Sequence, residues 1–215
     1  MYLQKNVIVI KNIYSSIQAN ASLEDNSVVL NWDAPLSSGF FKYDDGEYVT
    51  NIGSNTYNWG IKISANDMKQ YAGSKLSHIE MFDACKTKYT FKIYNGEKIN
   101  DNTLIHTFEY EAQNAHEFVK IAVGEIPFDA NEDLWITAKS VGAFSAPVPC
   151  SKYTGNDNGS YIKAGGYWVP AVGYNMNYTW MLRAYTSNDT IDNVKYNIYR
   201  NDELLASDLT KSTYI

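Results

Sequence analysis

The 215-residue sequence contains only 2 cysteines and 3 histidines, and it has no long apolar stretch. Two cysteines allow at most one intramolecular disulfide, and the sequence leaves open whether Cys85 and Cys150 are bridged or are two free thiols. No apolar run approaches the ~20 residues of a membrane-spanning helix. The run Val7–Ile10 is too short for the core of a signal peptide. We therefore expect no membrane span in this chain, and we expect any export signal to lie outside it.

The motifs of the common enzyme classes are also missing. The histidines, which are His78, His106 and His116, show neither an HExxH-like pattern nor the spacing of a metal triad. There is no G-x-S-x-G elbow, no phosphate-binding loop and no cysteine with the flanking sequence of a thiol protease. The sequence therefore predicts a protein that is not an enzyme.

Positive charge is scarce as well. The chain has 18 basic against 24 acidic residues, for a formal net charge of −6. The basic residues are scattered lysines, with Arg183 and Arg200 as the arginines, and they form no run along the sequence. Because a phosphate backbone is bound by a basic stripe, we expect no nucleic-acid partner.

Short runs of alternating polarity make up most of the chain. In Tyr89–Tyr94, for example, Tyr, Phe and Ile alternate with Thr, Lys and Tyr, as in a strand with one buried face. Similar runs predict strands at Asn58–Ile63, Lys75–Asp83, Tyr89–Tyr94, His106–Glu111, Glu117–Val123, Leu134–Ser140, Gly159–Ala164 and Tyr178–Tyr185. The best helical candidate is Ser64–Tyr71, which Ser64 can cap. Many short strands and almost no helix predict an all-β, jelly-roll-like β-sandwich.

The two ends of the chain resemble two parts of one fibronectin type III-like module. Near the start, Val28, Leu30 and Trp32 share one strand face, in a V-x-L-x-W pattern that ends at a proline. Near the end, the run Val194–Ala206 reads as a strand, a polar turn and a second strand. The resemblance implies that Trp32 shares a small core with the Tyr196 strand, although roughly 160 residues lie between them. Such an insertion is tolerated because loop-closure entropy grows slowly with length.

This interpretation divides the chain into an inserted domain and a discontinuous fibronectin type III-like segment. We expect residues 1–18 to be an N-terminal strand or linker and residues 39–191 to be the inserted jelly-roll-like β-sandwich. Residues 19–38 and 192–215 would form the first and second parts of the host module, the second being truncated. The chain would then be a fragment of a longer, secreted protein.

The middle region resembles the adhesin-type, jelly-roll-like domain inserted in fibronectin type III-like modules of secreted Bacteroidetes cell-surface proteins. The matching stretches, in order, are Phe41–Gly46, Trp59–Ile63, Asp67–Ile79, Tyr89–Gly96, Asp133–Thr137, Gly166–Trp168 and Tyr178–Arg183. The resemblance implies an adhesion or ligand-binding module of a multidomain secreted or cell-surface protein. The alternative is a carbohydrate-binding accessory domain of a secreted glycoside hydrolase or protease. The expected partners are a glycan or a host or cell-surface protein, together with neighbouring domains, at an extracellular or cell-surface location.

One loop departs from the family pattern and is the candidate ligand site. Where related domains have a Pro- and Gly-rich loop, this chain has Cys150–Gly159. Aromatic faces and amide hydrogen bonds are what sugar-binding sandwiches use. The candidate ligand-binding residues are Tyr153, Asn156, Asp157, Asn158 and Tyr167. The alternative is that the aromatic residues of this part of the chain fill the sandwich core.

A second candidate site is the acidic turn around Gly46. Asp44, Asp45 and Glu47 place carboxylate oxygens on a tightly turning backbone, which suits Ca²⁺. The alternative is an ordinary Asp-Gly turn, and the spacing does not match an EF-hand loop. Calcium is the cofactor that the sequence predicts, and we expect no other.

Overall fold

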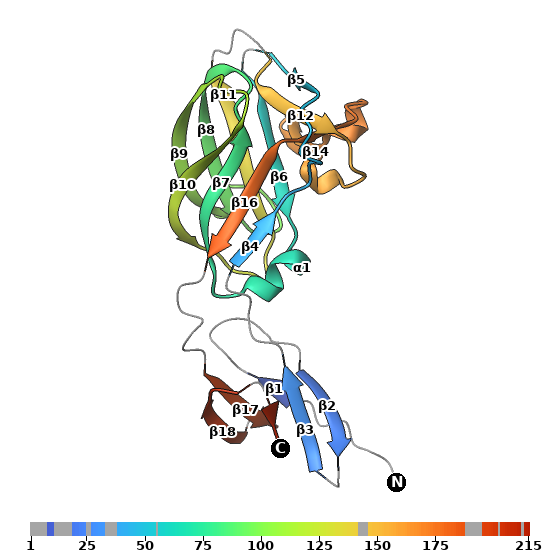
Figure 1. The fold of residues 1–215 in the computed structure, drawn as a ribbon, viewed down its shortest axis with the longest axis vertical. Helices are drawn as coiled ribbons and strands as arrows, with labels where there is room; N and C mark the ends of the chain where they lie inside the picture. The colour runs from blue at the N-terminus through green and yellow to red at the C-terminus, as the bar shows by residue number, and fades with distance from the viewer. Residues whose placement is uncertain are drawn as a thin grey trace.

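The computed structural model describes residues 8–10, 19–24, 27–32, 38–54, 56–141, 146–187, 195–201, 203–211 and 213–215. Its regular structure consists of strands, one short α-helix and three short 3₁₀ segments, and the predicted all-β sandwich is confirmed. Figure 1 shows the strands in two groups, a large unit and a small one. Within the described ranges, no helix has the length and apolar character needed to cross a membrane.

The large unit is built from two main sheets and a minor one. The four-stranded sheet has the order β10-β7-β16-β4, with β4 (Ser38–Phe41), β7 (Lys75–Phe82), β10 (Phe118–Pro127) and β16 (Leu182–Ser187). The six-stranded sheet has the order β14-β13-β6-β11-β8-β9, with β6 (Asn58–Ile63), β8 (Lys86–Asn95), β9 (Leu104–Gln113), β11 (Leu134–Val141), β13 (Tyr161–Ala164) and β14 (Tyr167–Pro170). The minor sheet contains β5 (Thr50–Ile52), β12 (Val148–Lys152) and β15 (Tyr178–Trp180).

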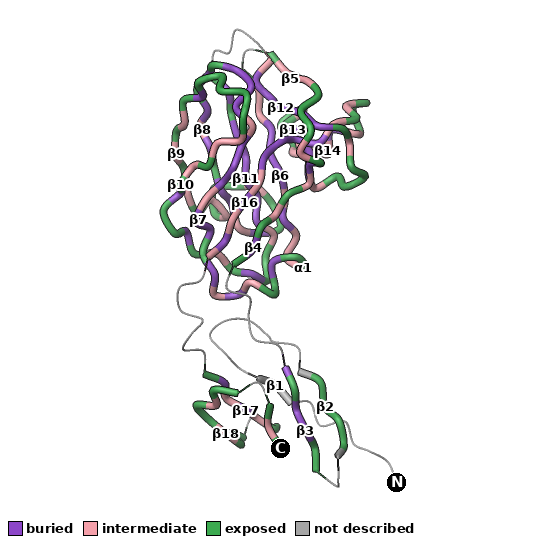
Figure 2. Tube along the Cα trace, in the orientation of Figure 1, coloured by how far each residue is buried: buried purple, intermediate pink, exposed green. Residues whose placement is uncertain are grey.

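The core of the large unit is formed by the alternate residues of its strands. In β8, Tyr89, Phe91 and Ile93 are buried in it, as the alternation predicts. Buried positions run along the strands of the large unit (Figure 2), and Trp59 and Trp180 are fully buried among them. Two hydrophobic faces thus cover one another, which is why the two sheets pack as layers.

The predicted helical segment Ser64–Tyr71 is found as a short α-helix followed by a 3₁₀ turn. Ser64 caps helix α1 (Ala65–Met68) by accepting a hydrogen bond from the Asp67 amide, 3.2 Å long. The 3₁₀ segment η1 (Lys69–Tyr71) continues the turn and is followed by Gly73 at φ +80°. The other 3₁₀ segments are η2 (Asp157–Gly159) and η3 (Ala171–Tyr174).

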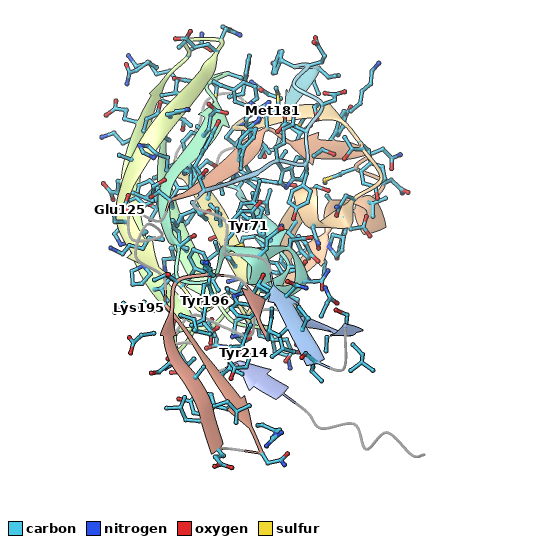
Figure 3. The ribbon with its side chains drawn as sticks, turned by 60° about the horizontal axis from the view of Figure 1, so that its bottom comes forward. Tyr71, Glu125, Met181, Lys195, Tyr196 and Tyr214 are labelled. Atoms are coloured by element: carbon cyan, nitrogen blue, oxygen red, sulfur yellow. The ribbon has the colours of Figure 1, made fainter. Side chains whose placement is uncertain are left out.

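The small unit contains two three-stranded sheets, β1-β17-β18 and β19-β3-β2. Their bounds are β1 (Ile8–Ile10), β2 (Ala19–Glu24), β3 (Ser27–Trp32), β17 (Tyr196–Arg200), β18 (Glu203–Leu209) and β19 (Thr213–Tyr214). Leu30, Trp32, Tyr196 and Ile198 form its buried cluster, and the Trp32 and Tyr196 rings meet edge to face, 5.1 Å apart. Tyr214 packs against this cluster, near Tyr196 in Figure 3.

The two ends of the chain therefore share a core, although the sequence separates them widely. The fibronectin type III assignment and the domain boundaries drawn from it stay predictions. Most of residues 1–18, together with 33–37 and 188–194, lie outside the described residues.

The two cysteines are both free and buried. The Cys150 sulfur donates a hydrogen bond to the Val148 carbonyl at 3.2 Å, and the Cys85 sulfur lies 3.4 Å from the Tyr89 hydroxyl. Of the two alternatives that the sequence leaves open, the structure shows two free thiols.

Candidate functional site

The acidic turn after β4 is held to the four-stranded sheet by an arginine. The two carboxylate oxygens of Asp44 accept hydrogen bonds from Arg183 Nε at 3.0 Å and Nη2 at 2.6 Å. Arg183 Nη1 donates to Glu80 Oε2 at 3.0 Å, and the guanidinium lies 3.5 Å from the centroid of the Phe118 ring. Burial disfavours the charge of Arg183, but the hydrogen bonds to Asp44 and Glu80 outweigh this effect and raise the pKa of the guanidinium. We call Arg183, Asp44 and Glu80 the arginine clamp.

Two of the predicted calcium ligands, Asp44 and Asp45, make hydrogen bonds within the protein. Asp44 is buried and its oxygens are engaged by Arg183. Asp45 instead accepts a hydrogen bond from the Glu47 amide at 3.0 Å, as in an ordinary Asx turn. Among the described residues, no group of three or more His, Cys, Asp or Glu side chains could hold a metal ion. Calcium binding at this turn stays a prediction that these contacts do not support.

Four of the five predicted ligand-binding residues lie in one turn between β12 and β13. The Tyr153 hydroxyl donates to Asp157 Oδ1 at 2.5 Å, and Asn156 Oδ1 accepts from the Asn158 amide at 3.0 Å. The turn thus satisfies several of its own polar groups. Its rim is exposed at Asn156 and Asp157.

Tyr167, the fifth residue, is not brought to this turn. It opens β14 and pairs with Ala164, at the far end of the β13–β14 hairpin from Ser160. At ~3.3 Å per residue, the length of β13 places it about 13 Å along the strand from the turn. Tyr167 is 76% exposed, so it is available for binding, but at a separate place.

The sequence did not reveal the most exposed aromatic arrangement on the four-stranded sheet. Ile79, Met81 and Ala184 of β7 and β16 are buried in the core, so the residues between them face outward. Among these outward residues, Phe82 and Tyr185 carry aromatic rings, and the arginine clamp lies on the same face.

Two exposed rings stack on these outward residues. Phe40 of β4 lies parallel to Tyr185, with ring centroids 4.5 Å apart and planes 22° apart. Tyr48, which follows the acidic turn, lies parallel to Phe82 at 5.0 Å and 14°. Phe40 is 45% exposed and Tyr48 is 38% exposed. We call Phe40 and Tyr48, with the two rings beneath them, the aromatic platform.

Further contacts fix the platform in place. The arginine clamp holds Asp44, which lies between Phe40 and Tyr48 in the sequence. The His116 ring meets Tyr48 edge to face at 6.2 Å. On the Tyr185 side, the Lys120 ammonium lies 4.5 Å from the ring centroid, and the Tyr185 hydroxyl donates to Glu80 at 3.2 Å. The exposed rings of Phe40 and Tyr48 are therefore preorganised by contacts within the protein.

The comparisons with known proteins give a likeness in fold alone. No protein-family model matches the chain, and no curated protein matches it either. One similar solved structure contains the cysteine protease and lectin-like domains of Cwp84, a surface layer associated protein of Clostridium difficile. It is 12% identical, with a TM-score of 0.50, and the match covers 76% of this chain and 38% of that one.

A second similar structure is the clostridial cysteine protease Cwp84 after propeptide cleavage. It is also 12% identical, with a TM-score of 0.48, and the match covers 71% of this chain and 41% of that one. The chain spans less than half the length of the solved chains that it matches. The resemblance to Bacteroidetes adhesin-type domains stays a prediction.

Proposed function

We propose that this chain is a glycan-binding module of a multidomain secreted or cell-surface protein, and that it binds without catalysing a reaction. The observation that carries the proposal is the aromatic platform, which presents the Phe40 and Tyr48 rings to solvent. The C–H faces of sugar rings pack on such π surfaces, and polar groups at the edge supply the hydrogen bonds that orient them.

The rigidity of the platform supports binding. Phe40 and Tyr48 each stack on a second ring, and the arginine clamp fixes the segment between these two residues through Asp44. A surface that is already ordered loses little conformational entropy when a ligand binds, so more of the contact energy appears as affinity.

The solved structure of similar fold supports a sugar-binding role, because it contains lectin-like domains of a surface layer associated protein. That structure also contains a cysteine protease domain, which favours the accessory domain of a secreted hydrolase or protease over an adhesion module. Both readings share an extracellular or cell-surface location, glycan binding and neighbouring domains in a longer chain.

The thiols of this chain support a non-catalytic role. A nucleophilic cysteine needs an accessible thiol with a lowered pKa. Burial instead raises the pKa of the Cys150 thiol to about 12. Cys85 is buried as well, with its sulfur against the Tyr89 hydroxyl. Neither thiol is placed to attack a substrate.

A glycan array with the whole chain tests the proposal, followed by titration of the best ligand with single variants. Tyr48→Ala and Phe40→Ala should each weaken binding by about tenfold, because each removes a stacking surface. Tyr174→Ala removes an exposed ring elsewhere and should leave affinity unchanged.

The predicted loop site is tested in the same titration with Tyr153→Ala and Tyr167→Ala. If these variants lose binding and the platform variants do not, the sugar site lies at the loop or hairpin instead. If no glycan binds, glycan recognition is wrong, and the alternatives are a host or cell-surface protein as partner or a purely architectural role. Hydrolysis of a glycan or peptide by the chain, abolished by one substitution, would overturn the non-catalytic part.

A further inference from the structure

Lysine side chains gather on the outer face of the six-stranded sheet. In β8, Tyr89, Phe91 and Ile93 are buried in the core, so Lys88 and Lys92 point away from it. The same alternation turns lysines of β6, β11 and β13 outward. We call this set the lysine face, and it consists of Lys62, Lys86, Lys88, Lys92, Lys139 and Lys163.

The strand register brings these lysines close together. Lys139 of β11 is paired with Thr90 of β8, so it lies diagonally between Lys88 and Lys92. Diagonal neighbours on one sheet face are about 7–8 Å apart. This spacing is comparable to the Debye length of about 8 Å at physiological salt, so neighbouring charges act together on a ligand.

The face extends across the sheet beyond Lys139. Lys139 is paired with Asn58 of β6, and the pairing of Ile162 with Trp59 places Lys163 beside Asn58. The positive charges therefore continue over four neighbouring strands.

Negative charge lies along one edge of this face, on β9, where Glu109 is paired with Thr90 and Glu111 with Lys88. Lys88 is 3.7 Å from Glu111, both of them well exposed, and Lys62 is 3.3 Å from Asp133. Within the described part of the chain, no ion-pair partner is found for Lys86, Lys92, Lys139 or Lys163. The six lysines outnumber the neighbouring Glu109, Glu111 and Asp133, although the chain as a whole has a net charge of −6.

We propose that the lysine face binds an anionic polysaccharide, with repeating carboxylate or phosphate groups, that lies across the strands. A single exposed charge contact contributes little, so binding needs a ligand that meets several lysines at once. Ammonium groups are point charges that accept either anion without fixed geometry. The site is independent of the aromatic platform, which belongs to the other main sheet, and goes beyond the glycan recognition proposed there.

A polysaccharide fits the lysine face better than a nucleic acid does. Among the described residues, the face has no arginine, the side chain suited to bidentate phosphate contacts. Two tryptophans lie on this face. Trp135 is 6% exposed and is covered by Lys62 and Tyr161, and Trp168 of β14, the cross-strand partner of Lys163, is partly buried. Base stacking needs an open ring, and neither ring is fully open.

The test measures binding of the whole chain to polygalacturonate, to dextran phosphate and to neutral dextran, at low and at high salt. The face variant replaces four exposed lysines by glutamine: Lys88, Lys92, Lys139 and Lys163. The control variant makes the same change in net charge at exposed lysines elsewhere: Lys69, Lys75, Lys98 and Lys152.

We expect the wild type to bind at least one anionic polymer and not neutral dextran, and to lose that binding at about 0.5 M salt through screening. The face variant should bind about tenfold more weakly or worse, and the control variant should bind within about twofold of the wild type. Binding to polygalacturonate would indicate recognition of carboxylates, and binding to dextran phosphate would indicate recognition of phosphates.

Three results would overturn the proposal: no binding to either anionic polymer at low salt, an equal loss in both variants, or tighter binding to double-stranded DNA of matched charge. If the face variant fails to fold, acetylation of the wild type replaces it. Polymer should then protect Lys92 and Lys139 from the reagent more than Lys75 and Lys152, and equal protection would contradict the proposal.

Discussion

Arg183 stabilises two carboxylates that the fold removes from water. Asp44 and Glu80 are 4% and 7% exposed, and the guanidinium bonds to both. A buried ion cluster of this kind adds little over an apolar substitute, but breaking it leaves charges without a partner. The main structural effect of Arg183 is therefore to fix the position of the acidic turn on the four-stranded sheet.

Replacement of Arg183 by leucine should lower the free energy of unfolding by about 3–5 kcal/mol, because Asp44 and Glu80 are left buried and unpaired. Arg183→Lys should cost less, since an ammonium keeps the charge but not the fork of hydrogen bonds. Denaturant unfolding measures both, with Arg200→Leu, an exposed arginine, as the control. A loss below about 1 kcal/mol for Arg183→Leu would show that the clamp is not a structural element.

Cys150 should make the protein lose stability in alkali. Burial raises the pKa of its thiol from 9.0 to about 12, so the folded state keeps a proton that the unfolded state releases. Stability from this thiol is complete below pH 9 and falls as the pH rises toward 12, by about 1.4 kcal/mol at pH 10. Cys150→Ala should therefore flatten the decline between pH 8 and pH 10, measured by denaturant unfolding under reducing conditions. An unchanged decline would contradict this account.

At the scale of elements, Asp83 joins β7 to the connection between β9 and β10. Its carboxylate accepts hydrogen bonds from the Gln113 and Asn114 amides, both at 2.8 Å, and its carbonyl accepts one from the His116 amide. Asn114 and His116 have positive φ angles of 64° and 55°. The buried carboxylate thus stabilises a turn that places His116 against Tyr48.

Asp83→Ala should destabilise the protein by about 2–3 kcal/mol, since the Gln113 and Asn114 backbone amides lose a charged acceptor. It should also weaken glycan binding by the aromatic platform. Without Asp83 the turn no longer holds His116 in place, and Tyr48 then loses its contact with the His116 ring. Asp101→Ala, at an exposed turn, is the matched control and should change neither quantity. Reduced stability with full glycan affinity would remove Asp83 from the positioning of the platform.

Local sequence predicted the elements better than the sites. The alternation predicted Asn58–Ile63 with the bounds of β6, and Tyr89–Tyr94 as the central part of the longer β8, because burial of one face dictates period two. The aromatic platform could not be predicted, because Phe40 and Tyr48 form it only by stacking on rings of β16 and β7, which are distant in sequence. Strand pairing between distant segments decides which rings meet, and no local pattern encodes it.

The lysine face likewise depends on strand pairing, although part of it leaves a signal in the sequence. Along the sequence the lysines are scattered and form no run. The register of β8, β11, β6 and β13 nevertheless collects six of them on one sheet face. Lys86, Lys88 and Lys92 at even spacing were the signal that sequence alone could have used.

At the scale of the molecule, the described residues form two buried clusters that share no member. The large cluster includes Trp59 and Trp180, and the small one consists of Leu30, Trp32, Tyr196 and Ile198. Separate cores unfold as separate cooperative units when few contacts join them. The small core brings together the two ends of the chain, so its stability depends on contacts between residues far apart in sequence.

Calorimetry of the whole chain should therefore show two unfolding transitions, and Trp32→Ala should shift one of them. Trp32 is 4% exposed and packs on Tyr196, so its removal should cost about 3–5 kcal/mol in the small unit. Trp59→Ala should shift the other transition instead. Because the aromatic platform and the lysine face both belong to the large unit, Trp32→Ala should leave binding of glycans and anionic polymers unchanged. A single transition that both substitutions shift equally would show that the two cores unfold as one.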